Sequence, residues 1–134
     1  MVANGIPGRL GKIHTMILYL YILSILLASI GDGLFDKGKK LIGHAMEALS
    51  VGLILISPYF VDAFTLYHIG GYLLVRVALY DPCYNLTRGL NICFIGTTSW
   101  WDKFVMLFNP PCWAMLFGRG IFLFTGIMIL IQMI

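Results

Sequence analysis

Charged side chains are scarce in this sequence. Lys and Arg together number 9 and Asp and Glu together number 6, so that 11% of the 134 residues are charged. Soluble domains are about 25% charged, and a chain of this size leaves roughly a third of its unfolded surface in contact with water after folding. So few charges cannot coat that surface. The composition therefore excludes a water-soluble monomer, together with disordered, collagen-like and coiled-coil proteins.

Cysteine is rare as well. The three cysteines, Cys83, Cys93 and Cys112, show no CxxC spacing. Their number and spacing predict small apolar residues rather than a disulfide framework or a zinc site, although one pair remains free to form outside the cytoplasm. The net charge of +3 is spread thinly and forms no basic stripe, so we expect no nucleic-acid partner.

Hydrophobic residues, in contrast, make up 60% of the chain, and the mean hydropathy is +0.90. They form four apolar stretches, at about 13–30, 41–60, 62–80 and 111–134. Each has the length of a helix that crosses a hydrocarbon core about 30 Å thick. We therefore predict an all-α, polytopic helical membrane protein with about four transmembrane helices in a single transmembrane domain, 1–134. The first stretch is longer than the apolar part of a signal peptide, about 7–15 residues, and we expect it to be a retained helix.

Prolines and aromatic residues indicate how the stretches are connected. Pro58 and Pro82 are predicted to end the second and third helices, because proline cannot continue a helix. The connection after Pro58 is so short that it predicts an antiparallel hairpin of these two helices. The segment 81–110 is too polar to cross, and its Trp100 and Trp101 are typical of headgroup depth. We expect it to be interfacial or re-entrant before the last helix.

Basic residues predict the orientation. The first tail carries Arg9 and Lys12, whereas the opposite end carries Lys37, Lys39, Lys40, Arg88 and Lys103. Because basic loops favour the cytoplasm, we expect loops 31–40 and 81–110 to be cytoplasmic and both termini to lie outside, in a bacterial or phage-related inner membrane. The glycosylation sequon at Asn85 would then face the wrong side, and we interpret it as a chance match.

Ionisable residues that interrupt or flank the apolar stretches form the candidate site, which we call the polar cluster. They are Asp36, His44, Glu47, His68, Arg76, Asp81, Arg88 and Arg119. A charge at the bilayer centre costs about 2.5–3.5 kcal/mol on insertion scales, so such residues usually face a partner or a water-filled space.

Helical spacing divides much of this cluster into two stripes. One stripe follows steps of four, four and three residues through Asp36, Lys40, His44 and Glu47. The other contains His68, Tyr72 and Arg76 and continues towards Tyr80 and Asp81. Because the two helices are expected to be antiparallel, Glu47 is predicted to pair with Arg76.

Several interpretations of the cluster remain open. It is either a structural contact within an assembly or the lining of a cytoplasmic cavity. A cavity would suit zinc or iron bound by Asp36, His44, Glu47 and Asp81, with His44 and Glu47 as the metal candidates on one helix face. It would also suit a proton relay through His44, Glu47 and His68, or an anion held by Arg76, Arg88 and Arg119. No GxSxG motif supports nucleophilic catalysis, and no catalytic residue is singled out.

The tripeptide at 68–70, His-Ile-Gly, followed by Asp81 and Tyr84, is similar to the haem- and quinone-site helix of the small membrane anchor subunits of succinate dehydrogenase. Those subunits are also short chains, usually with three spans. The resemblance covers one short stretch and implies a haem held between His44 and His68. The predicted fourth span departs from the plan of that family.

These observations favour a structural or accessory membrane subunit, or a self-assembling membrane component. We expect it to lie in the lipid bilayer as a homo-oligomer or as one subunit of a membrane complex. A proton or ion channel or transporter is the alternative, and a membrane enzyme or a binder of anionic lipid headgroups is the third hypothesis.

Overall fold

The computed structural model describes residues 7–60, 66–95 and 100–132, and these contain helices and turns but no strand. The elements in chain order are α1 (Pro7–Asp36), α2 (Lys40–Ile56), the 3-10 helix η1 (Ser57–Phe60), α3 (Leu66–Arg88), α4 (Trp100–Phe108) and α5 (Cys112–Gln132). The predicted all-α class is confirmed for the described residues.

Three segments are long and apolar enough to cross a membrane. They are Thr15–Asp36, Lys40–Phe60 and Cys112–Ile131, and they correspond to the first, second and last predicted stretches. α3 has 23 residues, about 35 Å at 1.5 Å per residue, but it is more polar than these three. The predicted start of the third stretch, at 62, lies outside the described residues.

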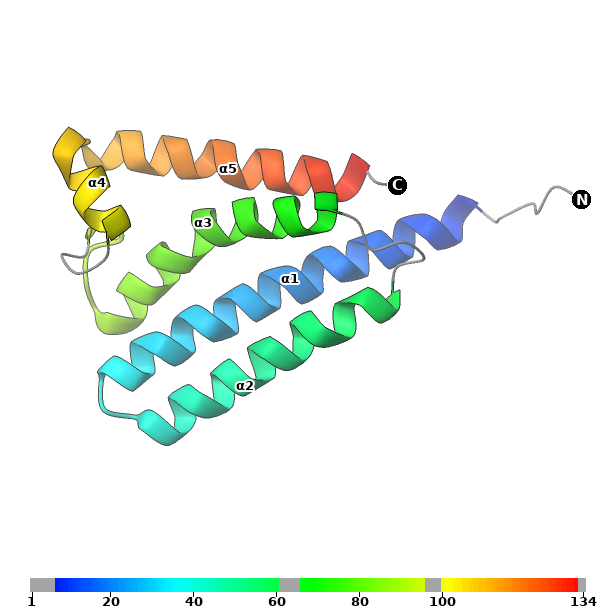
Figure 1. Ribbon diagram of the computed structural model, residues 1–134, viewed down its shortest axis with the longest axis horizontal. Helices are drawn as coiled ribbons and strands as arrows, with labels where there is room; N and C mark the ends of the chain where they lie inside the picture. Colours follow the sequence, from blue (N-terminus) through cyan, green and yellow to red (C-terminus); the bar gives the residue numbers. More distant parts are fainter. Residues whose placement is uncertain (1–6, 61–65, 96–99, 133–134) are drawn as a thin grey trace, which may run out of the picture.

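The four long helices form one layer in the order α2, α1, α3, α5 (Figure 1). α1 contacts α2 on one side and α3 on the other, and α3 also contacts α5. The predicted hairpin of the second and third helices is therefore wrong, because α1 lies between them and the described backbones of α2 and α3 do not come into contact. η1 packs on α1, where the Ser57 hydroxyl lies 3.5 Å from the Tyr21 hydroxyl.

Paired glycines bring neighbouring helices together at two places. A Cβ atom added to Gly43 would lie 2.8 Å from the carbonyl oxygen of Gly31, across the contact of α1 and α2. A Cβ atom added to Gly126 would lie 2.9 Å from the carbonyl oxygen of Gly71, across the contact of α3 and α5. Small residues permit such approaches between membrane helices.

Two predicted helix ends are wrong. α1 continues through most of the predicted loop 31–40 and leaves only a short turn, in which Gly38 has φ +81°. α3 continues through Pro82, which removes one backbone donor and leaves the rest of the helix bonded; Figure 1 shows α3 turning away from α5 towards its C-terminal end. The helix ends instead at Arg88 and is followed by Gly89, whose φ of +77° suits a glycine just after a helix C-terminus.

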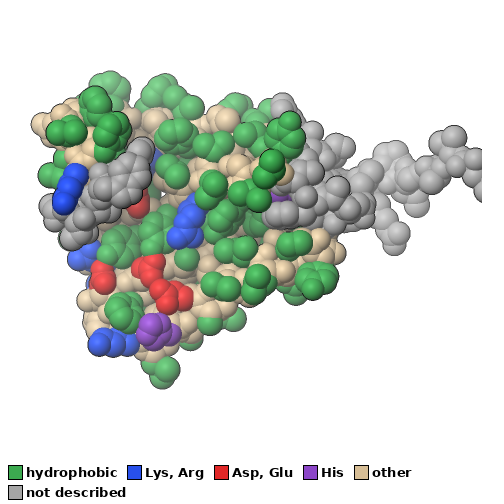
Figure 2. Space-filling view, viewed as in Figure 1, with side chains coloured by type: hydrophobic (Ala, Val, Ile, Leu, Met, Phe, Trp, Pro, Cys, Tyr) green, Lys and Arg blue, Asp and Glu red, His purple; other side chains and the backbone are tan. Residues whose placement is uncertain are grey.

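The interior of the layer is unusually polar, and its exterior is apolar. The buried residues of α1 include the large side chains of Ile17, Tyr21 and Ile25. They also include two residues with hydroxyl groups, Ser24 and Ser29. Large apolar side chains face outward on every long helix, and Figure 2 shows them covering much of one face while charged groups gather towards the end with the α1–α2 turn. Such an arrangement suits surroundings of lipid rather than water.

Candidate functional site

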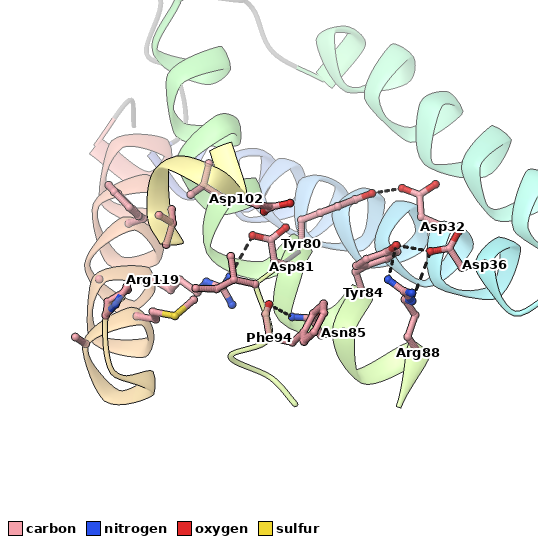
Figure 3. Close-up of a pocket in the computed structure, with 18 of the residues that line it drawn as sticks. Asp32, Asp36, Tyr80, Asp81, Tyr84, Asn85, Arg88, Phe94, Asp102 and Arg119 are labelled. Carbon is pink, nitrogen blue, oxygen red and sulfur yellow. Dashed lines mark hydrogen bonds and ion pairs between the residues drawn. The ribbon is translucent and has the colours of Figure 1, made fainter. Parts of the chain in front are cut away.

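Two polar stripes face each other where α1 packs on α3. Asp32 and Asp36 are four residues apart on α1, and Tyr80 and Tyr84 are four residues apart on α3, so each pair lies on one helix face. The Tyr80 hydroxyl donates to Asp32, and the Tyr84 hydroxyl donates to Asp36. Arg88, one turn further along α3, lies 3.5 Å from Asp36 through its Nε and donates to the Tyr84 hydroxyl at 3.0 Å (Figure 3).

The two tyrosines form a stack with an arginine on either side. The rings of Tyr80 and Tyr84 are nearly parallel, with their centroids 6.1 Å apart. The guanidinium carbon of Arg76 lies 4.6 Å from the centre of the Tyr80 ring, and that of Arg88 lies 5.2 Å from the centre of the Tyr84 ring. Cation–π contacts of this kind add to the hydrogen bonds, so the side chains on this face of α3 hold one another in place.

A second group of polar contacts joins α3 to α5. Arg119 of α5 forms an ion pair with Asp81 at 3.1 Å and also donates to the carbonyl oxygen of Ile92 at 3.3 Å. The side chain of Arg119 is 14% exposed, so the protein shields this cation from its surroundings. The Asp102 carboxyl of α4 is close enough to Asp81 for the two negative charges to repel each other. Figure 3 shows both carboxyls on the same side of the site.

The segment after α3 is fixed to both helices. Asn85, which is 3% exposed, donates from its side-chain amide to the carbonyl oxygen of Phe94 at 2.8 Å. Cys93 forms a disulfide with Cys112 at the start of α5, with a Cα–Cα distance of 5.4 Å. The expectation of small apolar residues is therefore wrong for this pair, which forms the one disulfide that the sequence left open, whereas Cys83 is a free thiol.

These contacts surround a cavity of about 580 Å³, which we call the polar cavity. Its wall comes from α1, α3, α4, α5 and the segment after α3. The charged and phenolic residues in this wall are Asp32, Asp36, Tyr80, Asp81, Tyr84, Arg88, Asp102 and Arg119. Apolar side chains such as Phe94 and Phe122 complete it. The volume lies within the range of small-molecule sites.

The polar cluster predicted from the sequence is only partly brought together here. Asp36, Asp81, Arg88 and Arg119 line the polar cavity. Asp36 belongs to α1 and not to the helix of His44 and Glu47, so the first predicted stripe is broken by the turn after Asp36.

Glu47 and Arg76 do not form an ion pair among the described contacts. α1 lies between their helices, and Asp32 of α1 takes the intermediate position. Asp32 interacts with Glu47 on one side and with Tyr80 on the other. Arg76 donates instead to the Tyr72 hydroxyl at 3.3 Å. The predicted direct pair is thus replaced by a connection through a carboxyl of the helix between them.

His44 and Glu47 of α2 do not line the cavity, but both contact α1: the His44 ring lies 5.1 Å from the ring of Phe35, and Glu47 interacts with Asp32. Nδ1 of His44 is 3.2 Å from Oε2 of Glu47, and the two side chains are 64% and 41% exposed. In the described part of the chain, no three His, Cys, Asp or Glu side chains are grouped as metal ligands would be.

His68 is buried, at 3% exposed, near the start of α3. His44 is near the start of α2, at the opposite end of the layer, and α1 separates the two helices. The structure therefore does not place these imidazoles on either side of a common haem. Of the three arginines, Arg88 and Arg119 line the polar cavity and Arg76 does not, and each is engaged by a neighbouring tyrosine or aspartate.

Sequence reasoning missed Asp102 as a cavity residue, and it did not identify which two cysteines form the disulfide. Asp102 lies in the short apolar helix α4, where a single carboxyl gives no periodic signal. The cysteines are separated by 19 residues, and their proximity depends on α4 and its flanking turns bringing the chain back to α5. The spacing of Arg76, Tyr80, Tyr84 and Arg88 was a readable signal that extends the second stripe.

The chain matches no known protein family, and no curated protein or solved structure shows significant similarity to it.

Proposed function

We propose that this chain is a four-span integral membrane protein that works as a homo-oligomeric subunit of a membrane assembly. Three spans are the apolar helices α1, α2 and α5. We assign the fourth to α3, since α1 and α5 flank it and its outward residues, Leu66, Ile69, Leu73 and Val77, are apolar. Its polar residues then face protein, as ionisable residues within membranes generally do.

The observation that carries this proposal is the exposed His44–Glu47 pair. By helical rise, His44 lies about 6 Å and Glu47 about 10 Å beyond Lys40, inside the span. α1 contacts the pair through Phe35 and Asp32 but leaves the His44 side chain 64% exposed and the Glu47 side chain 41% exposed. Polar side chains on a membrane helix hydrogen-bond across to another helix. A second copy supplies matching groups, because each copy presents a histidine donor and a glutamate acceptor on one face.

The test is the mass of the protein in lipid nanodiscs over a range of protein concentration. Wild type is expected to be oligomeric. The double variant His44→Leu, Glu47→Leu removes the polar contact while keeping similar bulk, and it is expected to be monomeric. The matched control His44→Gln, Glu47→Gln keeps hydrogen-bonding groups and is expected to stay assembled. A monomeric wild type, or an oligomer unchanged by the leucine variant, would contradict the proposal.

Proton or ion passage is the second candidate function. It is favoured by the polar contacts that run from His44 through Glu47 and Asp32 to Tyr80, because they connect the surface of α2 with the polar cavity. Liposomes are expected to show pH-dependent flux that Asp32→Asn and Glu47→Gln abolish. Flux that is equal in wild type and both variants would contradict this function.

We further propose that the cavity end of the molecule is cytoplasmic and that both termini lie outside. The lysines at this end, Lys37, Lys39, Lys40 and Lys103, support that orientation. The Cys93–Cys112 disulfide opposes it, because disulfides persist on the oxidising side of a membrane. Fusion of alkaline phosphatase to the C-terminus decides between them: an active fusion supports the proposed orientation, and an inactive fusion overturns it.

A further inference from the structure

We propose that the polar cavity binds a ligand that carries an ammonium group attached to an apolar chain, whether the amine belongs to a lipid headgroup or to a free small molecule. This binding site goes beyond the assembly role, and its residues do not include the His44–Glu47 pair. The argument rests on the charge of the cavity wall, the engagement of its arginines and the way in which the wall is fixed.

The cavity wall has an excess of negative charge in a chain that is positive overall. Four carboxyl groups, those of Asp32, Asp36, Asp81 and Asp102, line it together with only two guanidinium groups. The whole sequence contains 6 acidic residues and has a net charge of +3. Carboxylates in low-dielectric surroundings are costly unless a cation balances them. An ammonium group in the cavity supplies the missing positive charge.

The state of the arginines distinguishes this ligand from an anion. Arg119 is held by Asp81 and by the carbonyl oxygen of Ile92. Arg88 is held by Asp36 and by the Tyr84 hydroxyl. A phosphate would have to displace these aspartates from the guanidinium groups while facing the remaining carboxyls. An ammonium group can approach the carboxyl oxygens and leave both ion pairs in place.

The apolar part of the wall accounts for the rest of the ligand. Phe94, Val105, Met115 and Phe122 line the cavity beside the carboxyl groups. Binding sites for small molecules are mostly apolar, with a few polar groups that fix the orientation. This arrangement suits a molecule with carbon next to its amine better than it suits a bare inorganic cation, and no group of three metal ligands occurs in the described residues.

The wall is held open by contacts that do not depend on a ligand. The segment at 92–94 is attached to α5 by the Cys93–Cys112 disulfide and by the bond from Arg119 to Ile92, and to α3 by the bond from Asn85 to Phe94. A wall fixed in this way loses little conformational freedom when a ligand binds. The cavity is therefore preorganised.

The experiment compares lipid retention by native mass spectrometry. The full chain is released from nanodiscs that contain equal amounts of phosphatidylethanolamine and phosphatidylglycerol, with and without added hexylamine. We expect preferential retention of phosphatidylethanolamine, or, if the amine is a free molecule, binding of hexylamine alone. Equal retention of both lipids without hexylamine binding, or a preference for phosphatidylglycerol, would overturn the proposal.

Two variants place the binding in the cavity. Asp102→Asn is expected to weaken retention at least tenfold, whereas Lys39→Gln, which changes the charge by one unit at the same end of the molecule but outside the cavity wall, is expected to leave it unchanged. Met115→Lys provides a built-in ammonium group and is expected to abolish retention and to raise the unfolding temperature relative to Met115→Gln. If Asp102→Asn and Met115→Lys both retain the ligand as wild type does, the site is not this cavity. Oligomer mass in the same spectra reports separately on the assembly role.

Discussion

Replacing Gly126 with alanine is expected to destabilise the contact between α3 and α5. The new Cβ would lie 2.8 Å from Cγ2 of Val75, 2.9 Å from the carbonyl oxygen of Gly71 and 3.0 Å from Cβ of Leu74. A side-chain methyl can rotate away, but a backbone oxygen and a Cβ atom move only with their helix. The substitution therefore forces α3 and α5 apart over the contact that buries Val75.

The expected destabilisation by Gly126→Ala is estimated from other overpacked sites, where one added methyl group lowers the free energy of unfolding by about 1–3 kcal/mol. Two of the three close atoms at Gly126 are fixed to the backbone, so we expect a loss of about 2 kcal/mol in the free energy of unfolding. Gly120 lies on the same helix, and a Cβ there would meet nothing within 4 Å. Gly120→Ala is the matched control and is expected to stay within about 1 kcal/mol of wild type, because only helix propensity changes.

Unfolding is measured in mixed micelles as the fraction of protein that resists protease over a series of SDS concentrations. The midpoint is expected to fall for Gly126→Ala and to remain near wild type for Gly120→Ala. Equal midpoints for the two variants would refute the assigned contact of α3 and α5, because the same chemical change would then be insensitive to its position.

Three further outcomes are expected. Asp81→Asn removes the charged partner of Arg119 and is expected to lower the unfolding free energy by about 1.5–3 kcal/mol, as measured in the same SDS titration; a variant as stable as wild type would show that the pair is not formed. Reduction of the Cys93–Cys112 disulfide, which closes a loop over 19 residues, is expected to cost about 3 kcal/mol, and an unchanged midpoint in dithiothreitol would contradict this. Asn85 is expected to stay unglycosylated in either orientation, because its side chain is buried and bonded to the 91–95 segment; a shift in gel mobility that Asn85→Gln removes would show otherwise.

The sequence predicts the composition of the layer but not its order. The apolar runs at 13–30, 41–60 and 111–134 each correspond to a long helix, because hydrophobicity and length act locally. Which helices are neighbours depends on glycine contacts between distant parts of the chain. Gly31 meets Gly43 and Gly71 meets Gly126, and no periodicity within a single helix reveals either pairing. The expectation that consecutive helices pack together therefore failed for α2 and α3.

The candidate site shows the same division. The four-residue spacing on α3 is visible in the sequence, and Arg76, Tyr80, Tyr84 and Arg88 form one ordered face as that spacing predicts. Their partners on α1 are not predictable from spacing, because the contact depends on α1 lying beside α3. The position of Asp102 depends on where the short helix α4 is held, which no local pattern specifies.

The position of α3 between α1 and α5 has a consequence for synthesis of the protein in the cell. α3 is the most polar of the long helices, and its tyrosine hydroxyls and charged groups are accommodated by carboxyls of α1 and a guanidinium of α5. In the four-span arrangement that we propose, α5 is synthesised last, so α3 reaches the membrane before its partners on α5 exist. We therefore expect the stable insertion of α3 to wait for the final helix, and a nascent chain stopped before α5 to be degraded by membrane quality-control proteases.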